Sequence, residues 1–498
     1  MKRRMCLLGV VLLMFGGAAC AGPEGARIPA PVMIDADPPL NPYLANSPCP
    51  IAHFNPYCQG SSSLRGPEAG DDLVVSFLPG SPVSAFLLYT NPDAQGLYGV
   101  WASSAFHVYT IDDNTTPMQT MWTINKPVDL TNLMSGAYIL LDVDGTLFSP
   151  KANQIYAYRT ADPTDFRTPI VQSAVLDLPF LGEDDQVIAV NMTYDGYLAF
   201  ATAASVVGIV GRDFSDPQMI QVGGGGEQLS NSFAVDEDGG IYLITSKTMY
   251  RVQWTGTELT QDETQGAWSL PYDAGPQTLQ PGRVSTGSGT TPALMGFGNQ
   301  DKLVLVCDGR QIMHIIAYWR DQIPPDWQPI YPGADPRIAG DLPVDFGNPS
   351  AVGTNTEQAL VIRGGDALAV NNFKGNDPLT GGLAAFFSND PPYAPYGVQK
   401  FTWDPVGRQL ISAWANPEIS CPNGVPSMSS ASRLAYCIGQ RDTIWTLEAL
   451  DWDTGASAFH VMLGKGLEYN SFWANTEIGP NRNIITGTFM GTLDIRPR

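Results

Sequence analysis

The chain has few basic residues and no long apolar run, and each shortage excludes a class of protein. Lys and Arg number 27 against 49 Asp and Glu, which gives a net charge of −22 at pH 7. Nucleic acids and anionic membranes are bound through basic surfaces, so we expect neither as a partner. The apolar run over 7–15 is well short of the ~20 residues of a spanning helix, and no later run approaches that length. We therefore expect no transmembrane segment.

The first residues have the composition of an export signal. A basic head, Lys2-Arg3-Arg4, precedes the apolar core and a stretch of small residues. Cys20 closes the sequence Gly-Ala-Ala-Cys, which resembles a bacterial lipobox, with Gly17 where leucine is usual. We expect a signal peptide over 1–21. The exported protein would be an outer-membrane lipoprotein anchored through Cys20, or would be free in the periplasm or outside the cell.

Five cysteines remain beyond the signal, and none of their spacings resembles a zinc knuckle or a haem-attachment motif. In an oxidising compartment we expect disulfides between near neighbours, namely Cys49 with Cys58 and Cys421 with Cys437. Cys307 is left over inside an apolar run, and we interpret it as a buried apolar thiol.

Repeated Asp-Gly turns between apolar runs indicate the fold. Asp-Gly in this setting is a strong β-hairpin signal, because Gly accepts positive φ and Asp bonds the neighbouring backbone. The turns recur about 40 to 60 residues apart, the length of one four-stranded blade with its loops. We therefore predict an all-β chain, a β-propeller of about seven four-stranded blades, with six or eight also compatible. The clearest copies lie at 140–148, 193–200 and 235–243, and weaker ones at 96–101, 301–307, 366–370, 404–414 and 481–488.

The region before the first strand-like run is rich in Pro, Ala, Asn and Ser. This composition predicts an extended leader over 22–72, followed by one propeller over 73–498. The last apolar run, 490–495, would pair with an N-terminal strand and close the ring, which removes exposed sheet edges. Inserts at 275–293 and 322–358 are candidate face loops, where binding groups are often carried.

The segment Leu141-Asp142-Val143-Asp144-Gly145 resembles the nucleophile motif of haloacid dehalogenase phosphatases. The resemblance implies that Asp142 attacks phosphorus and that Asp144 acts as acid and base, with both binding magnesium. The resemblance is short, and the following chain lacks the helical periodicity that a parallel sheet needs. Asp236-Glu237-Asp238-Gly239 also repeats the pattern, so we interpret both segments as blade turns.

A second resemblance lies at 449–459, Ala-Leu-Asp-Trp-Asp-Thr-Gly-Ala-Ser-Ala-Phe. It is similar to the tryptophan-docking motif of quinoprotein dehydrogenases, with Phe459 in place of the docking Trp and Ala456 where Lys is common. In that family the motif holds blades together, so the resemblance implies a quinoprotein-like propeller fold rather than a bound quinone. Binding of pyrroloquinoline quinone would also need stacking aromatics, groups for its carboxylates and usually calcium. The adjacent cysteines of the family are absent.

The acidic turns are weak candidates for a metal site. Calcium is held by converging carboxylates and carbonyls, which Asp142 with Asp144, or Asp236 with Asp238, could offer. The simpler interpretation is that each Asp bonds its own backbone turn. The cofactor is therefore unassigned, and calcium fits the sequence better than pyrroloquinoline quinone.

The four histidines are scattered, and His314 is the most informative. It follows Asp308 and Arg310 on a strand with apolar neighbours, where a hydrogen-bonded structural histidine is the simpler interpretation. If that strand faced the central channel, these three residues would be the first group to test as an acid/base or anion site. We find no nucleophile elbow, Ser/His/Asp order, phosphate loop or nucleotide fingerprint.

The expected function is binding. The loops and central funnel of an exported, acidic propeller would engage a small molecule, a glycan or a protein partner. The alternative is an enzyme, either a calcium- or quinone-dependent oxidoreductase or a lactonase-like hydrolase with a site in the central funnel. An enzyme of this kind should carry its charged groups on innermost strands, whereas a binding module can place them on peripheral loops.

Overall fold

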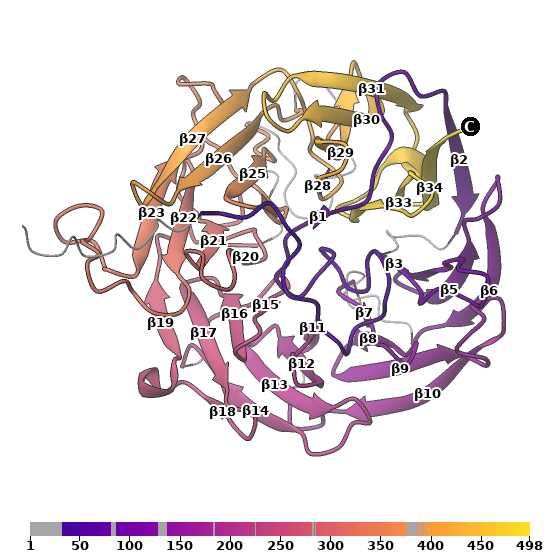
Figure 1. Cartoon of the computed structure of the whole chain (residues 1–498), viewed down its shortest axis with the longest axis horizontal. Helices are drawn as coiled ribbons and strands as arrows, with labels where there is room; N and C mark the ends of the chain where they lie inside the picture. The colour runs from indigo at the N-terminus through magenta and orange to yellow at the C-terminus, as the bar shows by residue number, and fades with distance from the viewer. Residues whose placement is uncertain are drawn as a thin grey trace, which may run out of the picture.

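The computed structural model shows an all-β ring (Figure 1). In the described residues, eight sheets stand around one axis as blades. In blades 1 to 7 the first strand lies nearest the axis, whereas in blade 8 the strand that comes first in the chain is the outermost. That part of the chain contains no α-helix, and none of its helical turns is long and apolar enough to cross a bilayer. The signal segment with Cys20 lies outside the described residues, which are 32–80, 86–127, 137–182, 185–224, 226–280, 283, 285–375, 387–389 and 393–498.

Blades 1 to 7, numbered in chain order, are built from consecutive strands that pair antiparallel and run from the axis outward. Blade 1 consists of β3 (Phe86–Tyr89), β4 (Val100–Ser103), β5 (His107–Asp112) and β6 (Gln119–Asn125), and blade 2 of β7 (Leu140–Leu141), β8 (Leu147–Lys151), β9 (Gln154–Thr160) and β10 (Ile170–Asp177). Blade 3 consists of β11 (Val187–Met192), β12 (Tyr197–Thr202), β13 (Val206–Gly211) and β14 (Gln218–Gln221). Blade 4 consists of β15 (Ala234–Val235), β16 (Gly240–Ile244), β17 (Thr248–Trp254), β18 (Leu259–Thr260) and β19 (Trp268–Pro271). Blade 5 consists of β20 (Ala293–Met295), β21 (Leu303–Cys307), β22 (His314–Trp319) and β23 (Ile338–Pro343). Blade 6 consists of β24 (Val361–Arg363), β25 (Asp366–Val370), β26 (Val398–Asp404) and β27 (Gln409–Asn416). Blade 7 consists of β28 (Ser427–Ser429), β29 (Leu434–Arg441), β30 (Ile444–Asp451) and β31 (Ser457–Gly464).

Blade 8 joins the two ends of the propeller. Its inner strands are β32 (Thr476–Ile478), β33 (Ile484–Thr488) and β34 (Gly491–Pro497), and its outermost strand is β2 (Leu73–Pro79). β2 pairs antiparallel with β34 from Leu73 opposite Pro497 to Pro79 opposite Gly491. Ring closure by an N-terminal strand is thereby confirmed.

The described residues form eight blades, where about seven were expected and eight was also compatible. Two of the turn copies read from the sequence, 366–370 and 404–414, belong to the same blade 6. The inner turn of blade 7, over 430–433, was missed because it has no Asp-Gly pair and places Arg433 at φ 55° instead. The eight copies therefore mark seven blades, and blade 7 is the one without a copy.

The Asp-Gly turns fold as the sequence predicted, because the first Asp organises the backbone. Oδ1 of Asp142 accepts the N–H groups of Asp144 and Thr146, at 3.0 and 2.7 Å. Oδ1 of Asp236 accepts those of Asp238 and Gly240 in the same way, at 2.9 and 2.7 Å. Gly145 and Gly239 stand at φ 79° and 80°, a conformation that favours glycine.

The leader is part of the ring. Its residues 49–62, which we call the hub segment, lie over the ring centre in Figure 1, and β1 (Ser61–Ser62) pairs parallel with β28. Carbonyl groups of the hub segment accept hydrogen bonds from the innermost strands of successive blades. The donors are the N–H groups of Tyr89, Leu141, Val235, Leu294, Ile362 and Met428, and the acceptors are the carbonyls of Cys49, Pro50, Pro56, Tyr57, Gln59 and Gly60, at 2.7 to 3.0 Å.

The cysteines differ in part from the expectation. Cys421 and Cys437 form a disulfide in blade 7. Cys49 and Cys58 are not joined to each other, because each is buried at its own place in the hub segment. The Cys49 thiol donates to the carbonyl of Ile51 at 3.3 Å, and the Cys58 thiol to that of Phe233 at 3.4 Å.

The hub segment should contribute strongly to the stability of the ring. Replacing Tyr57, whose side chain is fully buried, with Ala would leave a cavity at the axis and should lower the free energy of unfolding by about 3 to 5 kcal/mol. Leu40→Ala is the matched control from the leader, since Leu40 is 90% exposed and should change stability by less than about 0.5 kcal/mol. Chemical unfolding followed by tryptophan fluorescence measures both, and equal midpoints for the two variants would show that the hub segment is only a tether.

Candidate functional site

Two irregular connections face each other between blades 4 and 5. In blade 4, β18 and β19 both pair with β17, and the insertion 261–267 with its 3-10 helix Glu263–Gln265 separates them. In blade 5, the connection between β22 and β23 spans 320–337. It is longer than the matching connection of the other blades built from consecutive strands. Long irregular loops in compact domains are often functional.

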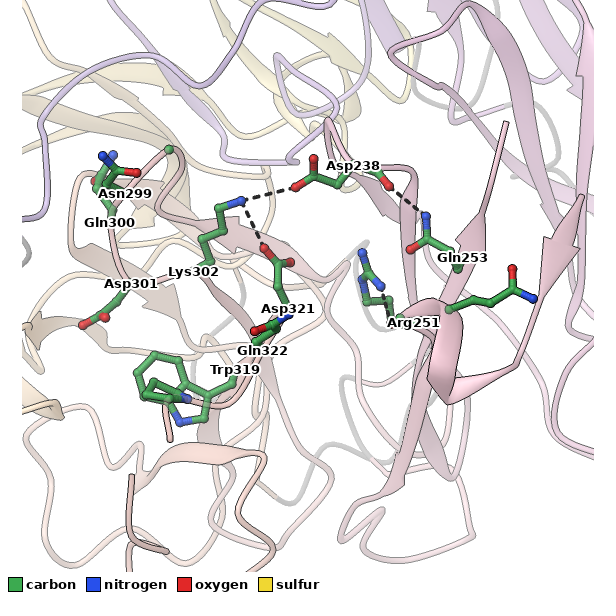
Figure 2. Close-up of a pocket in the computed structure, with 14 residues that line it drawn as sticks. Asp238, Arg251, Gln253, Asn299, Gln300, Asp301, Lys302, Trp319, Asp321 and Gln322 are labelled. Carbon is green, nitrogen blue, oxygen red and sulfur yellow. Dashed lines mark hydrogen bonds and ion pairs between the residues drawn. The ribbon is translucent and has the colours of Figure 1, made fainter. Parts of the chain in front are cut away.

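A groove lies between these two connections, and it consists of two adjoining cavities. The inner cavity, of about 600 Å³, is lined by the turns of blades 4 and 5 and by side chains of β17, among them Asp238, Arg251 and Lys302 (Figure 2). The outer cavity, of about 710 Å³, is lined by β19, the insertion and the long connection. The two cavities share Gln265, Gly266, Asp321 and Gln322, and we call them together the blade 4–5 groove.

Lys302 lies among three carboxylates in the inner cavity. Its ammonium group lies 3.1 Å from Asp321, 3.3 Å from Asp238 and 3.6 Å from Glu237. Figure 2 shows the side chain reaching from blade 5 toward Asp238 on the turn of blade 4. Burial alone would lower the pKa of Lys302, but the neighbouring Asp321 carboxylate outweighs it and raises that pKa. Lys302 therefore stays charged and joins the two blades.

Two arginines lie beneath the cavity and are engaged by the protein itself. Arg251 donates to the Tyr242 hydroxyl at 2.6 Å and to the carbonyl of Gly266. Arg320 is fully buried and lies 3.2 Å from Asp321. Its guanidinium covers the ring of Tyr57, at 5.0 Å from the centroid. The Tyr57 hydroxyl in turn donates to Glu237, so the floor of the groove is built on the hub segment.

The groups that face solvent in the groove are carboxylates and amides. The Asp238 side chain is 58% exposed, and Glu263 and Asp335 are also exposed. Gln265, Asn299 and Gln322 are exposed as well. Arg251 and Arg337 are turned inward, and Arg337 donates to the carbonyls of Trp319 and Asp321 at 2.9 and 2.8 Å. The groove therefore offers hydrogen-bond acceptors and negative charge to a ligand.

The predicted group Asp308, Arg310 and His314 is brought together, but away from the axis. Arg310 lies 3.1 Å from Asp308 and 2.9 Å from Asp341, and Asp341 also contacts Nδ1 of His314. His314 begins β22 and Asp341 is on β23, the third and fourth strands from the axis. Burial raises the pKa of Asp308 to about 6. The cluster is thus at the outer half of blade 5 and does not line the groove.

The acidic turns that were candidates for a metal site contact basic side chains of the protein instead. Asp142 and Asp144 lie 2.9 and 2.6 Å from the guanidinium of Arg212. Asp236 is buried and accepts from the Tyr242 hydroxyl at 2.7 Å, while Asp238 contacts Lys302. No group of three His, Cys, Asp or Glu side chains in the described part of the chain is arranged to hold a metal ion. These residues do not fit a calcium site.

The segment 449–459 forms a turn of blade 7 that contacts blade 6. Oδ1 of Asp451 accepts the backbone N–H of Thr454 at 2.8 Å. The indole of the buried Trp452 donates to Asp366 of blade 6 at 3.1 Å, so Trp452 makes a contact between blades 6 and 7. The adjacent cysteines of the quinoprotein dehydrogenases are absent from this sequence, and the hub segment lies over the ring centre (Figure 1).

A cluster of buried polar groups near the hub segment was not found by sequence reasoning. Glu477 lies beside the Cys49 thiol and the Asn475 amide, and burial raises its pKa to about 7. Neither its carboxylate oxygens nor the Asn475 amide makes a hydrogen bond of ordinary geometry. Burial lowers the pKa of His53 to about 4, so this imidazole is neutral. No periodic or motif signal in the sequence marks these residues.

Sequence reasoning identified one wall of the groove and missed the rest. The predicted face loop 322–358 includes residues 322 and 324 of the inner cavity and residues 322, 323, 335 and 337 of the outer cavity. Lys302 and Asp321 were not predicted as site residues. Each lies next to one end of an apolar strand run, and a charged residue in that place could have marked a candidate site. Arg251 is inside β17 and could not be distinguished from a solvent-facing residue of a strand.

Comparisons with known proteins place the chain among β-propellers. No family model matches the sequence. The sequence is 36% identical over 465 residues to an uncharacterized protein of Archaeoglobus fulgidus, covering 92% of this chain and 88% of that one. A europium-containing methanol dehydrogenase has a similar structure, with TM-score 0.57 and 12% identity over 89% of this chain and 90% of that one. The quinohemoprotein alcohol dehydrogenase from Comamonas testosteroni also has a similar structure, with TM-score 0.56 and 12% identity over 91% of this chain and 80% of that one. These likenesses show the fold alone, and they confirm its quinoprotein-like resemblance.

Removing the charge of Lys302 should lower the stability of the folded protein, and the size of the loss should depend on pH. Burial raises the pKa of Asp321, but Arg320 and Lys302 outweigh it, so the folded-state pKa lies below the ordinary value. A depressed carboxyl pKa contributes stability above about pH 4, and this contribution is lost as the pH falls further. We expect Lys302→Met to lower the free energy of unfolding by about 2 kcal/mol at pH 7, and by less at pH 3.

Lys465→Met is the matched control, because Lys465 is exposed and makes no ion pair with the described residues. It should change stability by less than about 0.5 kcal/mol at either pH. Chemical unfolding at the two pH values measures the effect. Equal losses for Lys302→Met at pH 3 and pH 7 would show that packing of the side chain, and not its charge, matters.

Proposed function

The chain belongs to the same family as the Archaeoglobus fulgidus protein, and for this chain we propose a binding function, with the blade 4–5 groove as the ligand site. The ligand is a polar molecule that is neutral or positively charged. The observation that carries the proposal is the arrangement of charges in the groove. The cations contact carboxylates and carbonyls of the protein, whereas Glu263 and Asp335 are exposed, and Asp238 is 58% exposed while it contacts Lys302.

Electrostatics supports this choice of ligand. In the inner cavity three carboxylates, Asp238, Asp301 and Asp321, accompany two cations, Arg251 and Lys302. The whole chain carries a net charge of −22, so an anionic ligand would approach against repulsion. Exposed amides next to carboxylates offer donors and acceptors together, which suits hydroxyl and amine groups.

Binding is favoured over the enzyme alternative by where the accessible charges lie. The charges of the groove are on connections between strands, apart from Arg251 on β17, and none is on the innermost strand of its blade. The predicted acid/base group, Asp308, Arg310 and His314, does not line the groove. The oxidoreductase alternative rests on likeness of fold to dehydrogenases, and fold is a poor guide to function.

The proposal includes export through the segment 1–21, with Cys20 as the candidate lipid anchor. The disulfide between Cys421 and Cys437 supports an oxidising compartment. A small polar molecule, a glycan or a segment of a protein partner are the classes of ligand that an exported propeller would meet.

Export can be tested by mass spectrometry of the protein expressed with its own N-terminus in a bacterial host. We expect the mature chain to lack at least residues 1–19 and to gain the mass of two hydrogens on reduction of the Cys421–Cys437 disulfide. A lipid anchor would add the mass of a diacylglycerol group on Cys20, and Cys20→Ala should abolish that addition. An unprocessed chain with both thiols free would contradict export.

The charge preference of the groove can be tested by a thermal-shift screen. The library contains neutral sugars, amines and amino sugars, carboxylates and phosphates, because a ligand of the folded state raises the melting temperature. We expect hits only among neutral and cationic compounds, and we expect Asp238→Asn to weaken them about tenfold. Asp144→Asn is the matched control, since Asp144 occupies the equivalent acidic turn of blade 2 and is also exposed. Equal effects of the two variants, or hits among anions, would contradict the proposal.

A further inference from the structure

We propose that the outer cavity of the blade 4–5 groove receives an extended basic peptide segment of a partner protein, which adds as a strand to the free edge of β19. This inference rests on the proposed function, because it names the ligand class of the same groove. It identifies an interaction surface and the chemistry of the partner that fits it.

The first support is the position of β19 at the edge of blade 4. β19 pairs with β17 alone, from Trp268 opposite Arg251 to Pro271 opposite Thr248. Its outer edge therefore has no strand partner among the described elements. An edge strand presents unpaired N–H and C=O groups at alternate residues, which an extended peptide can bind.

The second support is that this edge forms a wall of a cavity. Trp268, Ser269 and Leu270 of β19 line the outer cavity together with the connection over 321–323. A strand laid along β19 would thus lie inside a cavity of about 710 Å³ rather than on an open surface. β18 pairs with Gln253 and Trp254 at the other end of β17, so it lies in line with β19 and does not cover the outer edge of β19.

The third support is the charge of the walls. Glu263, Asp321 and Asp335 line the outer cavity against a single guanidinium, that of Arg337. Arg337 lies over the ring of Trp268, at 5.0 Å from the centroid, and donates to two backbone carbonyls. Negative charge beside a free strand edge selects lysine or arginine side chains at every second position of the peptide, because side chains of a strand alternate between its faces.

Isothermal titration calorimetry of the full-length protein tests the inference. The probe is the peptide Lys-Thr-Lys-Thr-Lys, acetylated and amidated, which carries three positive charges. We expect it to bind more weakly as the salt concentration rises. The peptide Glu-Thr-Glu-Thr-Glu should not bind. Spermidine, which also carries three charges but has no peptide backbone, should bind at least tenfold more weakly than the lysine peptide.

Two backbone-modified peptides test for strand addition directly. One carries N-methyl groups on the lysine amides and the other on the threonine amides, so charge is unchanged while alternate N–H donors are removed. Strand pairing uses alternate amides, so one peptide should lose at least tenfold in affinity and the other should bind like the parent. Glu263→Gln and Asp335→Asn should each weaken the parent peptide several-fold. Glu418→Gln, an exposed carboxylate elsewhere on the ring, should have no effect.

The outcomes separate this inference from the proposed function. If spermidine binds as tightly as the peptide, or both N-methylated peptides bind like the parent, strand addition is wrong while a cation-binding groove stands. Binding of the glutamate peptide would overturn the charge argument. If neither the lysine peptide nor spermidine binds, and the thermal-shift screen yields no neutral or cationic hit, both the inference and the proposed function fail.

Discussion

The structure depends on the hydrogen bonds between the hub segment and the innermost strands. An unpaired backbone N–H at the ring centre would cost free energy comparable to a lost hydrogen bond. The carbonyls of 49–60 accept such N–H groups from six of the blades, and Nδ2 of Asn191 from blade 3 also reaches Pro56. The ring is thus joined at its axis by the leader and at its perimeter by β2 with β34.

The same hub segment shapes the candidate site. Tyr57 is fully buried, donates to Glu237 and lies under Arg320, which connects it to the carboxylates around Lys302. A buried arginine is tolerable only when carboxylates and carbonyls engage its charge. Because these cations contact groups of the protein, the groups that the groove presents to a ligand are mostly acidic and amide groups. The interior charge network therefore decides the character of the surface.

The fold could be predicted further than the site, for a physical reason. Asp-Gly turns and alternating apolar runs are local signals, so the turns at 142–145 and 236–239 were readable from the residues alone. The turn at 430–433 is closed by Arg433 in a left-handed conformation, which composition does not reveal. Asp308, Arg310 and His314 are close because they share one hairpin, but their distance from the axis depends on which strand of the blade they occupy.

By itself, the sequence determined the all-β repeat, the pairing of the chain ends and the acidic character, since these follow from neighbouring residues and composition. Only the tertiary structure decided the eight blades, the separation of Cys49 from Cys58 and the groove between blades 4 and 5. Lys302 meets Asp238 and Asp321 across a blade boundary, and Tyr57 reaches Glu237 over 180 positions of chain. Contacts of this kind leave no local pattern in the residues, because they arise from the closure of the ring.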